Sequence, residues 1–307
     1  MLGRWVPVVS LFLAMLLWAS SFIALKIAFS HYDPMVVIFG RMLVAAFCFM
    51  FFLKYLMRFE YQKGDWRLLL LMVISEPCLY FLFEAHALQN TSAAQAGMIT
   101  SMAPLLVGIG ALYFLQEKLP KEAWLGFLVA VIGAVWLSVS GGETEHAPNP
   151  LLGNFLELCA MVCATGYILC LKHLSQRYST WFLTALQAFC GMIFFIPFLP
   201  FTGEETVWNL QWNWDGVWAV LYLGTLINIG AYGLYNLGVS KIKAAEASAY
   251  INLIPVFTLL MAYLILNETF NVQQMCASAL VLGGVFLSQR KASVKVDADA
   301  ADVAAAQ

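Results

Sequence analysis

Charged side chains are scarce in this chain. Asp, Glu, Lys and Arg make up 11% of its 307 residues, whereas hydrophobic residues make up 62%. A soluble domain carries roughly a quarter charged residues, so this chain has too little polar surface to cover a water-soluble globule. The mean hydropathy of +0.79 is instead typical of a chain that lies in lipid. The net charge of −2 gives no reason to expect a nucleic-acid partner.

The sequence also lacks the motifs of several enzyme classes. It contains no GxxxxGK[ST], no HExxH, no GxSxG, and no GxGxxG that follows a strand. These absences argue against ATP-driven transport by this chain and against the corresponding enzymes. All cysteines fall in apolar runs without the spacing of a zinc site, so we expect them to pack as small hydrophobic residues and to bind no metal or cofactor. They are Cys48, Cys78, Cys159, Cys163, Cys170, Cys190 and Cys276.

Long apolar segments dominate what is present. Ten segments are close to the roughly 20 residues that a helix needs to cross a bilayer. They cover 6–28, 34–56, 66–88, 92–115, 121–140, 151–172, 180–200, 216–238, 245–266 and 272–289. The sequence therefore predicts an all-α membrane protein with ten transmembrane helices. Residues 291–307 are polar and rich in Ala and Asp, and we expect them to form a disordered cytoplasmic tail.

The basic residues predict the orientation of these helices. If the N-terminus is cytoplasmic, 14 of the 16 Lys and Arg residues fall at cytoplasmic helix ends. The opposite loops at 89–91, 142–150, 201–215 and 267–271 contain none. Both termini are therefore expected in the cytoplasm. The two exceptions, Lys26 and Arg41, lie within apolar segments.

The two halves of the chain are related by a shift of 151 residues. This shift places Ala93 on Ala244, Pro104 on Pro255, Glu117 on Glu268 and Gly133 on Gly284. Each half contains five predicted helices, and because five is odd the second half must cross the membrane in the opposite direction. We therefore predict two inverted repeats, at residues 1–141 and 142–290, an arrangement typical of secondary transporters.

Charged groups inside a membrane are costly and usually face a cavity or the interior of a bundle. Glu76 lies ten residues beyond Trp66, about 15 Å along a helix and thus near the midplane, and Pro77 follows it. Glu76 is predicted to bind a substrate ammonium group or a coupling proton, with a structural, protonated Glu as the alternative. Arg41 could recognise a substrate carboxylate, form a gate pair with Glu84 or Glu157, or extend outward to the membrane surface.

Further polar and aromatic residues are candidates for the wall of a binding cavity, with core packing as an equal alternative. These substrate-binding candidates are Trp18, Tyr80, Met98, Asn228, Tyr232 and Tyr250. A second set is assigned to a gate or to structure, because its members lie at outer helix ends or recur in both halves. It comprises Glu84, Glu157, Glu117, Glu268, Pro104 and Pro255.

Several short motifs resemble those of one family. They are Trp18-Ala19-Ser20-Ser21-Phe22, Pro34 followed by Arg41, and in each half an Ala-rich start, a central proline and a Glu-x-Leu/Phe end. On these motifs the chain resembles the EamA-type exporters of the drug/metabolite transporter (DMT) superfamily, over about residues 6–289. Glu76-Pro77 departs from the family pattern.

This resemblance implies ten helices in two inverted repeats and export of amino acids or related metabolites across a bacterial inner membrane. It also implies a central cavity lined by helices 1, 3, 4, 6, 8 and 9, with helices 5 and 10 at the periphery. The superfamily includes nucleotide-sugar and sugar-phosphate carriers, so the substrate stays open.

The sequence therefore predicts a secondary transporter that works by alternating access, as a monomer or homodimer in membrane lipid. Its partners would be a small-molecule substrate and a possible coupling proton. An alternative from another class is an intramembrane lipid-handling enzyme, which would need catalytic groups at one depth. The four histidines are scattered over helix ends and loops, which disfavours this alternative.

Overall fold

A computed structural model describes residues 2–52, 61–114, 121–140, 143–144, 147–201, 212–242 and 244–287. Helices make up most of these residues, and short turns and loops connect them. Glu117 and the predicted tail at 291–307 lie outside the described residues. The all-helical architecture that the composition predicts is therefore present.

Seven helical segments are long and apolar enough to cross a membrane, and three shorter apolar helices accompany them. The long segments are Val6–Phe29, Trp66–Asn90, Ala93–Phe114, Pro150–Leu174, Thr180–Phe201, Trp214–Lys241 and Ala247–Leu266. The shorter ones are Pro34–Met50, Trp124–Ser140 and Val272–Leu287. Within the described residues, each predicted segment coincides with one of these long or shorter helical segments to within a few residues at most ends. The second prediction, 34–56, is too long, because the helix ends at Met50 and residues 51–52 form a turn.

The continuous helices are α1 (Leu2–Phe29), α2 (Pro34–Met50), α8 (Lys121–Ser140), α9 (Pro150–Leu174), α10 (Thr180–Phe195, extended by a 3-10 turn at Ile196–Phe201) and Val272–Leu287. Several begin at residues that satisfy their free N–H groups. Asp33 accepts a hydrogen bond from Met35 N before α2, and Asn149 accepts one from Leu152 N before α9. A proline follows each of these caps, at the first helical position, where no backbone N–H is needed.

The other membrane segments are interrupted. One runs through α4 (Trp66–Val73), a π-helix (Ile74–Leu79) and α5 (Tyr80–Asn90), and another through α11 (Trp214–Tyr222), a π-helix (Leu223–Ala231) and α12 (Tyr232–Lys241). Two further segments are broken near their middles. They are α6 (Ala93–Thr100) with α7 (Ala103–Phe114), and α13 (Ala244–Ala249) with a 3-10 turn (Tyr250–Asn252) and α14 (Leu253–Leu266).

Pro104 and Pro255 explain where the last two segments restart. Pro104 is the second residue of α7, and Pro255 is the third residue of α14. A proline in the first turn of a helix removes no helical hydrogen bond, whereas one in the interior would. Each proline therefore lies in the first turn of a new helix, and the helix is broken at both places.

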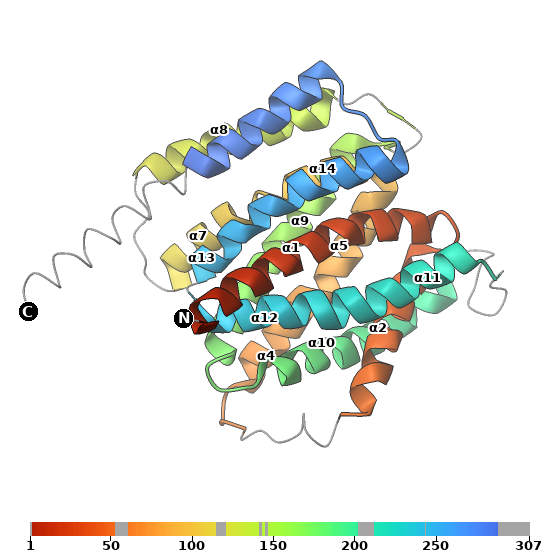
Figure 1. Cartoon of the computed structure of the whole chain (residues 1–307), viewed down its shortest axis with the longest axis vertical. Coiled ribbons are helices and arrows are strands. Elements are labelled where there is room, and N and C mark those ends of the chain that lie inside the picture. The colour runs from red at the N-terminus through yellow and green to blue at the C-terminus, as the bar shows by residue number, and fades with distance from the viewer. Residues whose placement is uncertain are drawn as a thin grey trace, which may run out of the picture.

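The helices form one bundle with a peripheral pair. In the bundle, α1 packs against α14 and α12, α9 packs against α5, and α2 packs against α10. At one edge α8 lies beside the helix Val272–Leu287 (Figure 1). A Cβ atom on Gly284 would lie 2.5 Å from Ala130 N, and one on Gly133 would lie 2.7 Å from Val281 N. The order of these contacts shows that the two helices are antiparallel, and the glycines permit their close approach.

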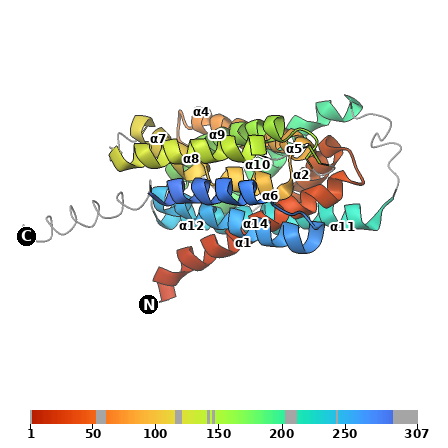
Figure 2. The ribbon, with the colours of Figure 1, turned by 90° about the horizontal axis from the view of Figure 1, so that it is seen from above.

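Large apolar side chains are exposed on the outside of the bundle, as expected for a surface in contact with lipid. On α8 they include Trp124, Leu128, Val135 and Trp136. The start of α1 and the end of the helix Val272–Leu287 lie at the same end of the bundle in both views (Figures 1 and 2). The two described ends of the chain are thus on one side.

Candidate functional site

A cavity of about 50 Å³ lies in the centre of the bundle. Its wall comes from both halves of the chain and is mainly aromatic and apolar, with three charged residues. The lining residues are Trp18, Ser21, Phe22, Arg41, Glu76, Tyr80, Phe81, Glu84, Thr100, Ala103, Met161, Ala164, Tyr167, Ile168, Tyr232, Ile251 and Ile254. None of them lies on α8 or the helix Val272–Leu287, which the resemblance assigned to the periphery.

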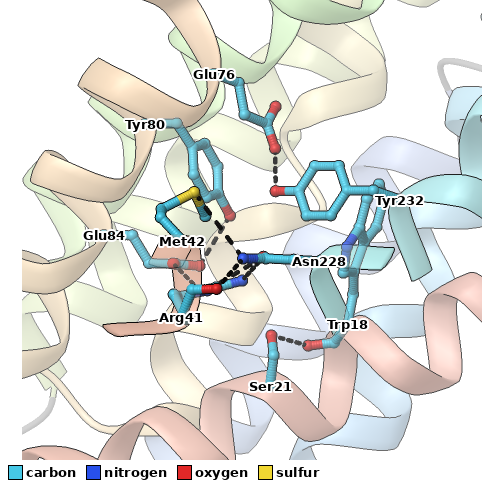
Figure 3. Close-up of polar contacts among 9 residues, drawn as sticks. All are labelled: Trp18, Ser21, Arg41, Met42, Glu76, Tyr80, Glu84, Asn228 and Tyr232. Atoms are coloured by element: carbon cyan, nitrogen blue, oxygen red, sulfur yellow. Dashed lines mark hydrogen bonds and ion pairs between the residues drawn. The ribbon is translucent and has the colours of Figure 1, made fainter. Parts of the chain in front are cut away.

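Glu76 lines this cavity at a point where its helix is interrupted. Its backbone is extended (φ −148°, ψ 119°) inside the π-helix, immediately before Pro77. The side chain is 3% exposed, and Tyr232 Oη donates a hydrogen bond to Glu76 Oε1 (Figure 3). The main-chain oxygen of Glu76 accepts a hydrogen bond of 3.1 Å from Gln187 Nε2. Glu76 belongs to the first half of the chain, and its two hydrogen-bond partners, on α10 and α12, belong to the second half.

Aromatic rings surround the Glu76–Tyr232 pair. The Trp18 ring lies 5.2 Å from the Tyr232 ring and 4.6 Å from the Tyr235 ring, between centroids. Phe81 and Tyr167 approach Tyr232 at 6.4 and 6.2 Å. Such a wall excludes water, and aromatic faces also attract cations.

Arg41 forms a second polar cluster on the same cavity (Figure 3). Its side chain is 1% exposed, and it donates hydrogen bonds to Asn228 Oδ1 from Nη2 (2.7 Å) and Nε (3.2 Å). Its Nη1 atom lies 3.9 Å from Glu84 Oε2, and its guanidinium carbon lies 4.2 Å from the centre of the Phe81 ring. Tyr80 Oη donates a hydrogen bond of 3.0 Å to Glu84 Oε1. The buried cation therefore has a carboxylate, an amide and a ring around it.

The two clusters differ in the groups that they leave for a ligand. An Arg side chain is always charged, and here Glu84 and Asn228 already compensate Arg41. Glu76 has a neutral phenol as its hydrogen-bond partner, and a carboxylate beside aromatic rings can receive an ammonium group. The geometry thus favours Glu76 as the binding group and Arg41 as part of the framework or gate.

The structure brings together most of the predicted site residues. Trp18, Arg41, Glu76, Tyr80 and Tyr232 line the cavity, and so does Glu84. Asn228 contacts Arg41 and lines a small adjoining pocket with Met42, Pro77 and Gln187. Met98 does not line the cavity, because it packs against Leu137 and Ala277 beside the peripheral helix pair. Tyr250 packs against the main core, and its neighbour Ile251 lines the cavity instead.

The predicted gate or structural residues occupy different places. Glu268 is buried and accepts hydrogen bonds from the N–H groups of Ala93 (3.0 Å) and Ala94 (2.9 Å), at the start of α6. Glu157 is 0% exposed on α9. Glu84 is only 3% exposed and lies beside Arg41.

Sequence reasoning missed Phe81, Tyr167 and the individual lining residues of α9, although the resemblance assigned this helix, the sixth, to the cavity wall. Tyr167 Oη donates a hydrogen bond to Asn236 Oδ1, and Phe81 stacks on Arg41. The α9 residues Met161, Ala164 and Ile168 recur at helical spacing and all line the cavity. With Glu157 four residues earlier, this spacing was a signal for one buried face.

Apolar helices long enough to cross a membrane, interrupted near a buried charged cavity, define a multi-pass membrane protein of the transporter type. Comparison with known proteins gives the family. The EamA-like transporter family matches this chain twice, at residues 5–139 and 151–289. The chain belongs to this family, within the DMT superfamily.

Its relatives are named as transporters. The chain is 28% identical over 231 residues to "Uncharacterized transporter YetK" of Bacillus subtilis, which covers 74% of this chain and 68% of that protein. It is 27% identical over 281 residues to an uncharacterized transporter of Archaeoglobus fulgidus (91% and 96%). It is 23% identical over 284 residues to the "Probable terminal-alkyne amino-acid exporter" of Streptantibioticus cattleyicolor (92% and 93%).

A solved structure titled "Crystal structure of protein" shares the fold. It matches with a TM-score of 0.63 and 18% identity, covering 92% of this chain and 96% of that one. Membership of the EamA-like transporter family makes the chain a transporter and not an enzyme, so the alternative of an intramembrane lipid-handling enzyme is set aside.

Proposed function

We propose that this protein exports amino acids or closely related small metabolites by alternating access, with Glu76 as the group that binds the substrate ammonium. The observation that carries this proposal is the position of Glu76. Its carboxylate lies on a central cavity between both halves, hydrogen-bonded to Tyr232 and enclosed by aromatic rings. One relative is named an amino-acid exporter, which supports the same substrate class.

The proposal includes ten transmembrane helices in two inverted repeats. The family match at residues 5–139 and again at 151–289 supports two equivalent halves. The π-helices at Ile74–Leu79 and Leu223–Ala231 overlap under the 151-residue shift, and so do the breaks at 101–102 and 250–252. The same two helices of the repeat are thus interrupted in each half.

Reciprocal contacts support an inverted relation between the halves. Under the shift, Gly133 is equivalent to Gly284 and Ala130 to Val281, so the close contacts Gly133–Val281 and Gly284–Ala130 are one contact made twice. Likewise α6 packs against α14, and α7 packs against α13. Equivalent helices that cross each other in opposite directions are expected for a two-fold axis in the membrane plane.

The remaining parts of the proposal concern the orientation of the chain, the membrane in which it lies and the charge of its substrate. The basic residues favour cytoplasmic termini, and the described chain ends lie on one side of the bundle. Bacterial relatives favour a bacterial inner membrane. A nucleotide-sugar or sugar-phosphate substrate is less well supported, because Arg41 is the one cation among the described lining residues and Glu84 compensates it.

The test is counterflow of radiolabelled amino acids in proteoliposomes. We expect Glu76→Gln to lower exchange at least about tenfold, which corresponds to the loss of one charge-assisted bond of about 1.4 kcal/mol or more. Cys78→Ala is the matched control, because Cys78 lies on the same π-helix but does not line the cavity. Equal exchange by wild type and Glu76→Gln would show that Glu76 does not bind the substrate.

A further inference from the structure

Glu157 is a buried acidic group whose carboxylate has no hydrogen-bond partner in the part of the chain that the structure describes. It lies on α9, seven residues after Pro150, and its exposed fraction is 0%. Among the described residues, neither Oε1 nor Oε2 of Glu157 has a hydrogen-bond partner. A bare carboxylate charge in such a place is very costly, so this site requires a positive ligand or a bound proton.

The surroundings of Glu157 favour a proton over a metal ion. No group of three or more His, Cys, Asp or Glu residues with metal-binding geometry occurs among the described residues. The titratable groups that interact electrostatically with Glu157 are Glu84 and Tyr80, both on α5. On its other sides, α7 contains no acidic or basic residue, while α6 and α8 contribute the neutral groups Gln95 and Ser138 to a network around Asn154.

Glu157 continues the cavity-lining face of α9. Met161, Ala164 and Ile168 follow it by 4, 7 and 11 residues, which places all four on one side of the helix. The three later residues line the cavity, so Glu157 lies one turn beyond its described wall. A proton on Glu157 is therefore close to the substrate cavity but separate from Glu76.

Loss of the proton from Glu157 would affect the neighbouring Arg41–Glu84 pair. Arg41 Nη1 and Glu84 Oε2 lie 3.9 Å apart, and neither atom has a hydrogen-bond partner among the described residues. If Glu157 lost its proton, its negative charge would repel that of Glu84, and one of the two carboxylates would have to be neutralised or moved. Glu84 pairs with Arg41, which also holds Asn228 of the second half, so a change at Glu84 would act on a contact between the two halves.

From this arrangement we propose that Glu157 is a proton-binding site of the transport cycle, occupied in the described conformation. The step is the formation of one O–H bond at a Glu157 oxygen, with the proton taken from water on one side of the membrane and returned to water on the other. No electron transfer is involved. A role for this proton in a transport cycle rests on the proposed export function, but proton binding and export can be tested separately.

The first experiment measures the proton itself, by infrared difference spectroscopy of the purified protein in lipid vesicles. We expect the carbonyl stretch of a protonated carboxylic acid in wild type at neutral pH, and a loss of band intensity in Glu157→Gln. Glu268→Gln is the control, because both carboxylate oxygens of Glu268 already accept hydrogen bonds from backbone N–H groups. A wild-type spectrum without the band, or an unchanged band in Glu157→Gln, would overturn the proposal. The wild-type measurement remains decisive even if the Glu157→Gln variant does not fold.

The second experiment measures coupling, in proteoliposomes loaded with a mixture of radiolabelled protein amino acids. An outside-acid gradient should speed wild-type efflux about 5-fold or more, the lower end of usual coupling between two sites. Glu157→Gln should keep exchange without a gradient and lose this acceleration. Acceleration of wild-type size in Glu157→Gln would refute a coupling role. If wild type exchanges none of the amino acids, the proposed function fails, while the infrared result still decides whether Glu157 binds a proton.

Discussion

The Arg41–Glu84 pair gives the most quantitative prediction for the framework of the site. Glu84→Gln preserves the shape of the side chain and its hydrogen-bonding capacity toward Tyr80 while it removes the negative charge. Arg41 is then left as a cation with 1% exposure, with Asn228 and the Phe81 ring as its nearest compensation. We expect this variant to be much less stable than wild type.

The geometry sets the size of the effect. Two unit charges 3.9 Å apart attract each other by about 4 kcal/mol at an effective dielectric constant of about 20. Removing one partner from a buried pair costs about 3–5 kcal/mol, because the remaining charge stays desolvated. We therefore expect Glu84→Gln to lower the free energy of unfolding by about 3–5 kcal/mol.

A double-mutant cycle separates this pair from other effects. Arg41→Gln, Glu84→Gln and the double variant are unfolded in mixed micelles by increasing amounts of denaturing detergent, with helix content as the signal. The double variant contains no uncompensated charge, so it should recover at least about 1 kcal/mol relative to the sum of the single losses. Additive losses, or a Glu84→Gln variant as stable as wild type, would refute the ion pair.

Two further predictions concern the packing of the halves. Gly284→Ala should cost about 1–3 kcal/mol of stability, because the new Cβ would lie 2.5 Å from Ala130 N. Gly283→Ala should cost nothing, because a Cβ there would have no described atom of another helix within 4 Å. Equal stabilities of the two variants in the same unfolding assay would contradict the close helix pair. Glu268→Ala should cost about 2–4 kcal/mol, since it leaves the buried N–H groups of Ala93 and Ala94 without an acceptor. A change below about 0.5 kcal/mol would show that Glu268 does not cap α6.

The helices could be predicted from the sequence because a chain segment inside lipid has few structures open to it. A segment of about 20 apolar residues must satisfy its backbone internally, and a helix does so. The 151-residue register also placed Pro104 on Pro255, and the structure has a break in the helix near both. The end of α2 at Met50 was not predictable, because apolar residues continue beyond it to Leu53.

The faces of the helices were harder to predict. In a water-soluble helix, polar residues mark the outside, but here lipid and protein interior are both apolar, so composition does not separate them. Met98 and Tyr250 were therefore placed in the cavity with Trp18 and Tyr232, although they pack elsewhere. Phe81 and Tyr167 were overlooked for the same reason. The charged residues gave the better signal, because Arg41, Glu76 and Glu84 all line the cavity.

The most direct test of the account compares substrates that differ in one group. Wild-type proteoliposomes are loaded with radiolabelled amino acids, or with the matching acids that lack the amino group, and counterflow is measured under the same conditions. If the Glu76–Tyr232 pair recognises an ammonium group, the amino acids are exchanged and the acids without it are exchanged at least about tenfold more slowly. Equal exchange of the two sets, or exchange of only the acids without an amino group, would contradict an ammonium-binding site at Glu76.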